Sequence, residues 1–407
     1  MPLYHNDDQA MLKDSVAPFV AEQAPVSHLR KLRDSADATG FSRDLWSQFT
    51  EMGLPGMLVP EEHGGLGMGH MEAGIVLEEI GRNLTPSPFL STSVGAVAAL
   101  AKAGGTQAGR WLPAIASGEA IIALAIDEGA KHRPDRIATT ATRAGNGFRL
   151  DGKKSFVLHG HVADMSIVAA KTDGGITLFA VSKDAKGLTA DPRRLVDSSL
   201  ASHVTLDGVE VDADAVIGEV DSGGNVLDAL LAATRTGAAA EMVGVGQGAM
   251  DMTVTYLKER KQFGKLIGEF QGLQHRAAHL YGEMEVARAT VMKAQQLLDE
   301  GNEGARLMVS VAKAKAGRAA NLAVREGVQM HGGIGMTDEY DIGLYMKRDR
   351  ALAEYMGDVH YHIDQVARMN GYSSHPSRLR EGQRAPDLIR GAAGRADRPT
   401  GPTPTLP

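Results

Sequence analysis

The sequence predicts a mainly helical protein with a small β-domain in the middle of the chain. In the first and last thirds the apolar residues recur at helical spacing, whereas between them the apolar period shortens towards two. The length of 407 residues, with 43% hydrophobic side chains, is sufficient for two or three domains with large cores. We therefore expect an N-terminal helical domain, a central antiparallel β-domain and a C-terminal four-helix bundle.

The N-terminal helical domain is expected over residues 1–119. Apolar side chains such as Ala73, Val76, Leu77 and Ile80 recur at the spacing that places them on one face of a helix. Glycine and proline cannot lie inside a regular helix, so the segments rich in them predict tight loops. These segments are residues 53–60 and 64–67.

The middle β-domain is expected over residues 120–220. It contains short apolar runs separated by Gly and Asp turns, as expected for antiparallel strands. The runs are residues 121–126, 166–170, 176–181 and 203–206, and the turns lie at 173–175 and 207–208.

The C-terminal helical bundle is expected over residues 221–370. Two long helical segments, 225–260 and 271–300, suit an antiparallel bundle, and a glycine-rich break follows at 332–335. Residues 371–407 are rich in Pro, Gly, Arg and Ser and contain few large apolar side chains, so they predict a disordered tail.

Composition excludes several classes of function. The net charge of -7 is spread along the chain, which argues against nucleic acid as a partner. The absence of cysteine excludes disulfides, thiolate metal sites and cysteine nucleophiles, so any redox chemistry requires a bound cofactor. No signal peptide and no apolar run of membrane-spanning length is visible, which predicts a cytoplasmic protein without membrane contact. The histidine pairs 159/161 and 360/362 lack a nearby acidic cluster, so we expect no metal site.

Four motifs occur in order along the chain. They are VPEEHGGLG at 59–67, GKKSFVLHG at 152–160, ERKQFGKLIGEFQ at 259–271 and QMHGGIGMT at 329–337. Together, over about residues 5–370, they resemble the acyl-CoA dehydrogenase family, including subunits of heteromeric bacterial members. The resemblance implies FAD-dependent α,β-dehydrogenation of an acyl-CoA thioester in fatty-acid or side-chain degradation. It also implies a homo- or hetero-oligomer, a dimer or tetramer in which a neighbouring subunit holds part of the FAD, and electron-transfer flavoprotein as a candidate electron acceptor.

The resemblance also implies a set of FAD-binding residues. They are Arg260, Phe263, Gln271, Gln329, Gly333 and Phe156. A guanidinium such as that of Arg260 can meet a pyrophosphate with forked, charge-assisted hydrogen bonds. Phe263 would give an aromatic wall to the adenosine half, and Phe156 would stack on the flavin ring. The alternative interpretation makes Arg260 a solvated cation at a helix end and the glycines part of an ordinary loop.

Near the flavin ring the sequence departs from the family pattern. Leu158 stands where many members have a hydroxyl residue that hydrogen-bonds the flavin, and leucine has no donor. Ala125 and Ile126 likewise occupy a segment in which Thr or Ser commonly contacts the ring.

The largest departure concerns the catalytic base. Removing the weakly acidic proton from Cα of an acyl thioester requires a positioned carboxylate. The family places a Glu before a Gly on a C-terminal helix or, alternatively, before an Arg on the first bundle helix. Here these positions are Met356 and Thr234, the latter preceding Arg235, which the resemblance makes a substrate-binding residue. Neither Met356 nor Thr234 can accept a proton, so the catalytic residue is left unassigned.

Three carboxylates remain as candidate bases: Glu241, Glu354 and Asp358. The alternative interpretation of each is a structural or surface carboxylate. Two functional hypotheses follow. In the first, the chain works with a related subunit that supplies the Glu and a complete flavin site, a non-catalytic scaffold being the limiting case. In the second, it is a stand-alone enzyme with an unusual base, or a flavin-dependent oxidase or monooxygenase on the same fold.

Overall fold

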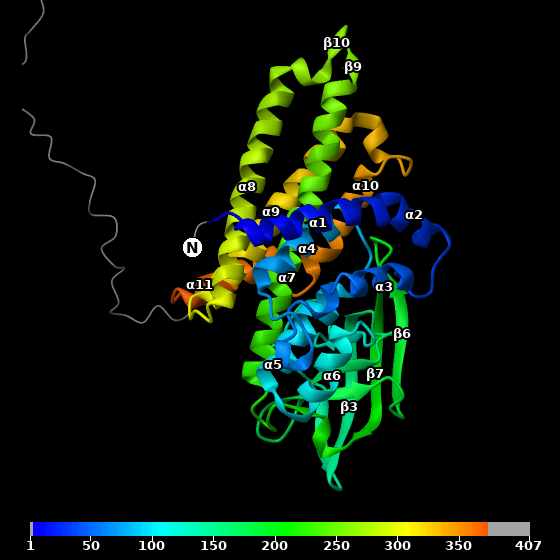
Figure 1. The fold of residues 1–407 in the computed structure, drawn as a ribbon, viewed down its shortest axis with the longest axis vertical. Helices are drawn as coiled ribbons and strands as arrows, with labels where there is room; N and C mark the ends of the chain where they lie inside the picture. Colours follow the sequence, from blue (N-terminus) through cyan, green and yellow to red (C-terminus); the bar gives the residue numbers. More distant parts are fainter. Residues whose placement is uncertain (1–2, 373–407) are drawn as a thin grey trace, which may run out of the picture.

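A computed structural model describes residues 3–372 of the chain. The predicted fold class is confirmed: helices precede and follow a β-sheet in the chain, and the long C-terminal helices extend away from the sheet (Figure 1). The tail predicted at 371–407 lies outside the described residues, except for Gly371 and Tyr372.

The N-terminal region is helical. Its helices are α1 (Asp7–Gln23), α2 (Val26–Asp34), α3 (Arg43–Glu51), α4 (His70–Arg82), α5 (Val97–Ala103) and α6 (Gly105–Ala116), with 3-10 turns at Leu54–Gly56 and Glu61–His63. The first glycine- and proline-rich segment contains the turn at Leu54–Gly56, and the turn at Glu61–His63 lies between the two segments, flanked by Pro60 and Gly64. A π-helical segment, η3 (Leu90–Ala96), leads directly into α5. A Cβ on Gly95 would lie 2.4 Å from Thr234 Oγ1, so glycine allows η3 to pack closely on the long helix that follows the sheet.

The central region is one twisted sheet. Its strands are β1 (Ile122–Ala125), β2 (Thr140–Ala144), β3 (Gly147–Leu158), β4 (Met165–Lys171), β5 (Ile176–Ser182), β6 (Leu188–Arg194), β7 (Leu200–Val211) and β8 (Val216–Ile217), with a 3-10 turn at Ala213–Ala215. The order is β6-β7-β3-β2-β4-β5-β8, with β1 pairing with β4. Most pairs are antiparallel, as predicted, but β4 pairs in parallel with both β1 and β2. The parallel pairing follows from the crossovers that return the chain to β4 from the same end of the sheet.

The C-terminal region is helical, as predicted, and its described residues form five helices where the sequence predicts four. It consists of α7 (Gly224–Glu259), α8 (Gln271–Asp299), α9 (Ala305–His331), α10 (Ile342–Glu354) and α11 (Val359–Met369), with 3-10 turns at Ile267–Glu269 and Gly332–Met336. The short hairpin β9 (Lys261–Gln262) and β10 (Lys265–Leu266) joins α7 to α8 at the end far from the sheet (Figure 1). Helix α7 is buried along most of its length because it packs against α4, α8, α9 and α10, which explains its apolar composition on all sides.

The three regions share their cores. A large apolar cluster joins α1, α3, α4, the inner face of the sheet, and α7 to α10. A second cluster joins α5, α6, β1, β4 and the first turns of α7, and Met356 lies within it. The loop that contains Met356 is therefore held where the sheet and the bundle meet.

None of the described helices combines the length and the apolarity needed to cross a membrane.

Candidate active site

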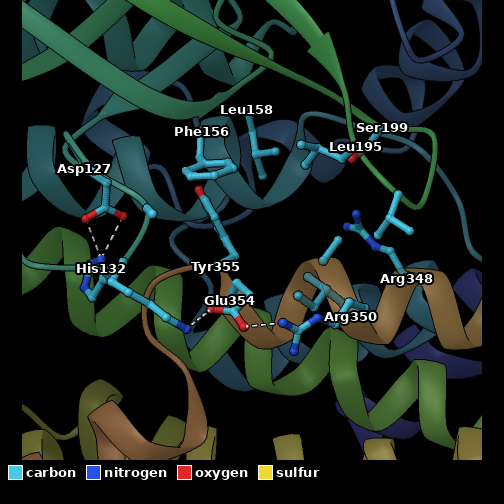
Figure 2. Close-up of a pocket in the computed structure, with 16 residues that line it drawn as sticks. Asp127, His132, Phe156, Leu158, Leu195, Ser199, Arg348, Arg350, Glu354 and Tyr355 are labelled. Carbon is cyan, nitrogen blue, oxygen red and sulfur yellow. Dashed lines mark hydrogen bonds and ion pairs between the residues drawn. The ribbon is translucent and has the colours of Figure 1, made fainter.

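A cavity of about 410 Å³ lies between the sheet and the C-terminal helices (Figure 2). Phe156 and Leu158 of β3 form one wall, and the end of α10 with Tyr355 forms the opposite wall. Asp127 and His132, in the loop after β1, lie at one side. Figure 2 shows Tyr355 extending across the cavity towards Phe156. The space between two aromatic side chains is suited to a flat, largely apolar ligand.

An irregularity in β3 positions Phe156. The β3–β7 register shifts between Lys154 and Val157, and Phe156 adopts a positive φ of 55°. Just before the shift, the buried Lys154 Nζ donates to two backbone carbonyls and to Glu128 Oε1 at 2.7 Å. These contacts fix the strand, and the bulge turns the ring of Phe156 outward, where it is 46% exposed. An aromatic ring held half-exposed in a strained conformation indicates a ligand-facing surface.

The loop after α10 presents Met356. Its side chain is 2% exposed and packs in the apolar cluster of Leu124 and Leu231. Its φ is 57°, an uncommon value for a residue that is not glycine and one that costs about 1–3 kcal/mol. In the part of the chain that the structure describes, the backbone N–H of Met356 makes no hydrogen bond. An unpaired backbone donor in a strained, buried loop lacks an acceptor among the described residues.

Three buried basic side chains hold this loop. The Met356 carbonyl accepts from Arg235 Nε and His362 Nε2, each at 3.2 Å. The Lys313 Nζ donates to the carbonyls of Leu352 at 3.0 Å and Gly357 at 3.2 Å. Burial lowers the pKa of Lys313 to about 8 and the pKa of His362 to about 2. Because these contacts fix the carbonyls, the strained conformation of Met356 is determined by the surrounding residues.

A hydrogen-bonded chain connects this loop to the cavity wall. Asp127 accepts from His132 Nδ1 at 2.8 Å, and Arg235 donates to His132 Nε2 at 2.8 Å and to the Tyr361 hydroxyl at 3.0 Å. A guanidinium can only donate, so the His132 ring is neutral with its proton on Nδ1. Burial, opposed by Asp127, lowers the pKa of His132 in agreement with this assignment. His132 therefore acts as an acceptor that orients Arg235.

A second cavity of about 360 Å³ lies on the other side of Arg235. The arginines that line it are Arg133, Arg235, Arg306 and Arg368. Arg133, Arg306 and Arg368 each pair with an aspartate in the same lining. Arg235 pairs with no carboxylate among residues 3–372, and burial lowers its pKa. A largely buried guanidinium with only neutral partners leaves a net positive charge beside this second cavity.

The three candidate bases are all ion-paired. Glu241 binds Arg348 at 2.5 Å, and Arg348 also binds Asp197 at 2.7 Å. Glu354 contacts Lys131 at 2.8 Å and Arg350 at 3.0 Å.

Asp358, the third candidate, caps α11. It accepts from the Tyr361 backbone N–H at 2.8 Å and from Lys131 at 2.9 Å. Burial would raise the pKa of Asp358, but these two hydrogen bonds outweigh it, so the pKa is lowered. A carboxylate with a lowered pKa and two donors is a poor proton acceptor.

The predicted FAD-binding residues fall into two separate groups. Five lie exposed at the end of the bundle far from the sheet: Arg260, Phe263, Gln271, Gln329 and Gly333. Phe263, at the turn of the β9–β10 hairpin, is 93% exposed with a φ of 52°. Phe156 lies instead in the cavity beside the sheet (Figure 2). The cavity that Phe156 lines contains none of the other five residues.

The sequence did not reveal Asp127, His132 or Lys313 as site residues. Lys313 carried a usable signal, since it shares a helical stripe with Val309, Ala316 and Ala320, where an apolar residue is expected. Asp127 and His132 lie in an irregular loop, and no periodic pattern marks them.

Comparisons with known proteins identify the fold. Family models match the acyl-CoA dehydrogenase N-terminal domain at residues 6–119, the middle domain at 127–209 and the C-terminal domain at 221–370. The acyl-CoA dehydrogenase FadE12 of Mycobacterium tuberculosis is 33% identical over 362 residues, which cover 85% of this chain and 91% of that protein. This chain belongs to the acyl-CoA dehydrogenase family.

Two further acyl-CoA dehydrogenase relatives bear on assembly. A chain of the ChsE4-ChsE5 complex from Mycobacterium tuberculosis superimposes with a TM-score of 0.85 at 26% identity, covering 92% of this chain and all of that one. The caffeyl-CoA reductase-Etf complex subunit CarC of Acetobacterium woodii is 28% identical, covering 87% of this chain and 96% of that protein. Members of the family are FAD-dependent oxidoreductases, so the predicted cofactor and enzyme class are confirmed.

Proposed function

We propose that this chain is the subunit of a heteromeric, FAD-dependent acyl-CoA dehydrogenase that lacks a catalytic base of its own. The observation that carries the proposal is the loop of Met356. Its strained backbone and the three basic side chains that hold it are those of a functional site, but its side chain is an apolar thioether. A thioether sulfur does not accept the proton from Cα.

The described residues fit FAD if two subunits share it. The half-exposed ring of Phe156 suits the flavin ring, whereas Arg260 and Phe263 lie far from it in the same chain. The exposed residues of the β9–β10 hairpin, with Gln271, Gln329 and Gly333, would therefore contact FAD held by a neighbouring subunit. When bound, FAD supplies the acceptor for the hydride from Cβ.

The acyl-CoA thioester would bind between the two cavities. The unpaired N–H of Met356 can donate to the thioester carbonyl, and Arg235 provides the cation that anionic groups of CoA require. His132 and Tyr361 keep the Arg235 guanidinium in place. This part of the chain can bind and orient a thioester without being able to deprotonate it.

A related subunit would supply the catalytic carboxylate within its own site. This chain would complete the FAD site of that subunit with Arg260 and Phe263. The name of the ChsE4-ChsE5 complex, whose chain is similar over nearly its full length, supports assembly with a second, related chain. The similarity to a subunit of an Etf complex supports electron-transfer flavoprotein as the electron acceptor. A cytoplasmic location stays a prediction.

The test is to purify the chain alone and together with a related subunit. We expect the isolated chain, reconstituted with FAD, to reduce a dye acceptor with acyl-CoA thioesters at the background rate. We expect the co-purified pair to be active and to lose activity when Arg260 of this chain is replaced. Full activity of the isolated chain would contradict the proposal.

A further inference from the structure

A third, much smaller cavity of about 30 Å³, here called the inner cavity, lies behind Leu158. Leu158, Ser199 and Arg348 line both this inner cavity and the large one, so they form the wall between them. The volume exceeds the roughly 10–15 Å³ that one water-sized group requires. The inner cavity therefore has room for a hydroxyl group but not for a ring or a branched chain.

His159 lines this space and has an unpaired polar atom in its ring. The residue is 9% exposed and lines the inner cavity, and its Nδ1 has no hydrogen-bond partner among the described residues. Burial lowers the pKa of His159 to about 3, so the ring is neutral and carries one N–H and one lone pair. A buried ring nitrogen without a protein partner can bind a polar group from outside the chain.

Glu241 supplies the matching acceptor. Both nitrogens of Arg348 that reach this carboxylate contact Oε1, at 2.9 and 2.5 Å, and Oε2 makes no hydrogen bond in the part of the chain described. The third nitrogen of Arg348 donates to Asp197 at 2.7 Å. Because two carboxylates hold Arg348, its side chain is fixed in the wall, whereas Leu158 has no polar side-chain atom that could be held in this way.

We propose that the inner cavity is a hydroxyl-binding subsite for the far end of the acyl group. The inference rests on the proposed binding of an acyl-CoA thioester in the large cavity. A hydroxyl group can donate to Glu241 Oε2 and accept from His159, which satisfies both polar groups at once. A methyl group can do neither, and a ketone can only accept. The substrate class is therefore an acyl-CoA that carries an alcohol beyond the reacting carbons.

Ligand binding tests the subsite without catalysis. The probes are ω-hydroxyacyl-CoA thioesters of increasing chain length, each matched with the acyl-CoA that has a methyl in place of the hydroxyl. Their Kd values for the FAD-loaded protein are measured by calorimetry. At one chain length we expect the alcohol to bind at least about tenfold more tightly. His159→Phe should remove this preference and leave the Kd of the methyl ligand unchanged.

The control is His161→Phe, in the same turn after β3, where Nε2 contacts the Ala38 carbonyl at 3.0 Å. This variant should keep the preference. The subsite is overturned if no chain length shows a preference, or if His159→Phe retains it.

A crystal structure of the purified chain separates this inference from the proposed function. A solvent oxygen bonded to both His159 Nδ1 and Glu241 Oε2 supports the subsite, even if no CoA thioester binds and the proposed function fails. A His159 Nδ1 bonded to a protein acceptor instead, with no oxygen in the cavity, overturns it.

Discussion

The β9–β10 hairpin is predicted to bind FAD, and the loop of Met356 lies where the family's catalytic base is expected. The two regions differ in whether groups of the same chain contact them. The hairpin exposes Arg260 and Phe263 to solvent, and neither residue lines the large cavity. The loop is buried, and basic side chains of the same chain satisfy its carbonyls. The hairpin has the residues that FAD requires, but the loop lacks the residue that proton removal requires. This difference is expected of a subunit that completes a site in another chain.

The difference between the buried loop and the exposed hairpin is tested first at Arg348, which lines the large cavity. Arg348→Ala should lower the free energy of unfolding by about 3–5 kcal/mol, because it leaves Glu241 and Asp197 buried without their cation. Urea unfolding measures the change. The control is Arg350→Ala on the same helix, whose exposed pair with Glu354 should contribute no more than about 1 kcal/mol. Equal losses in the two variants would show that the cavity wall is not built on this cluster.

A substitution in the exposed hairpin should instead weaken cofactor binding and leave the stability of the fold unchanged. Arg260→Ala should leave the unfolding transition unchanged, because the side chain is exposed, but should weaken FAD retention by about 1.5–3 kcal/mol. Flavin content after gel filtration of the assembled protein measures the loss. Lys261→Ala, the adjacent cation, serves as the control and should retain FAD. A variant that holds flavin as tightly as the parent would show that Arg260 does not contact the cofactor.

The loop should show a pH dependence that the hairpin lacks. Burial lowers the pKa of Lys313 to about 8 from 10.5, so between these values the unfolded chain binds more protons than the folded chain. The stability contributed by this group is therefore present above pH 10.5 and is lost as the pH falls through about 8. Over that window the free energy of unfolding should rise with pH by at most about 1.4 kcal/mol per unit.

Lys313→Met should abolish this rise, as measured by urea unfolding across the window. Lys315→Met, which removes a lysine nearer the surface of the same helix, should preserve it. The same slope in parent and Lys313→Met would place its origin elsewhere.

The sequence could predict the fold because the helical and strand periods follow burial on one side of each element. The motifs could predict FAD-binding residues in and beside the β9–β10 hairpin because these residues form one continuous stretch of sequence around Arg260. The pairing of Glu241 with Arg348, 107 residues later, could not be predicted, since tertiary packing alone brings them together. The same is true of Lys313, whose contacts are two backbone carbonyls on α10 and the loop that follows.

The central claim is that this chain lacks its own base, and Met356→Glu tests it most directly. The isolated, FAD-loaded parent should reduce a dye acceptor at the background rate. Met356→Glu should raise the rate at least about tenfold, at the low end of general-base effects, because the loop already orients this position. Met356→Gln, of similar shape but unable to take the proton, should stay at background. Strong activity in the isolated parent, unchanged by either substitution, would contradict the account.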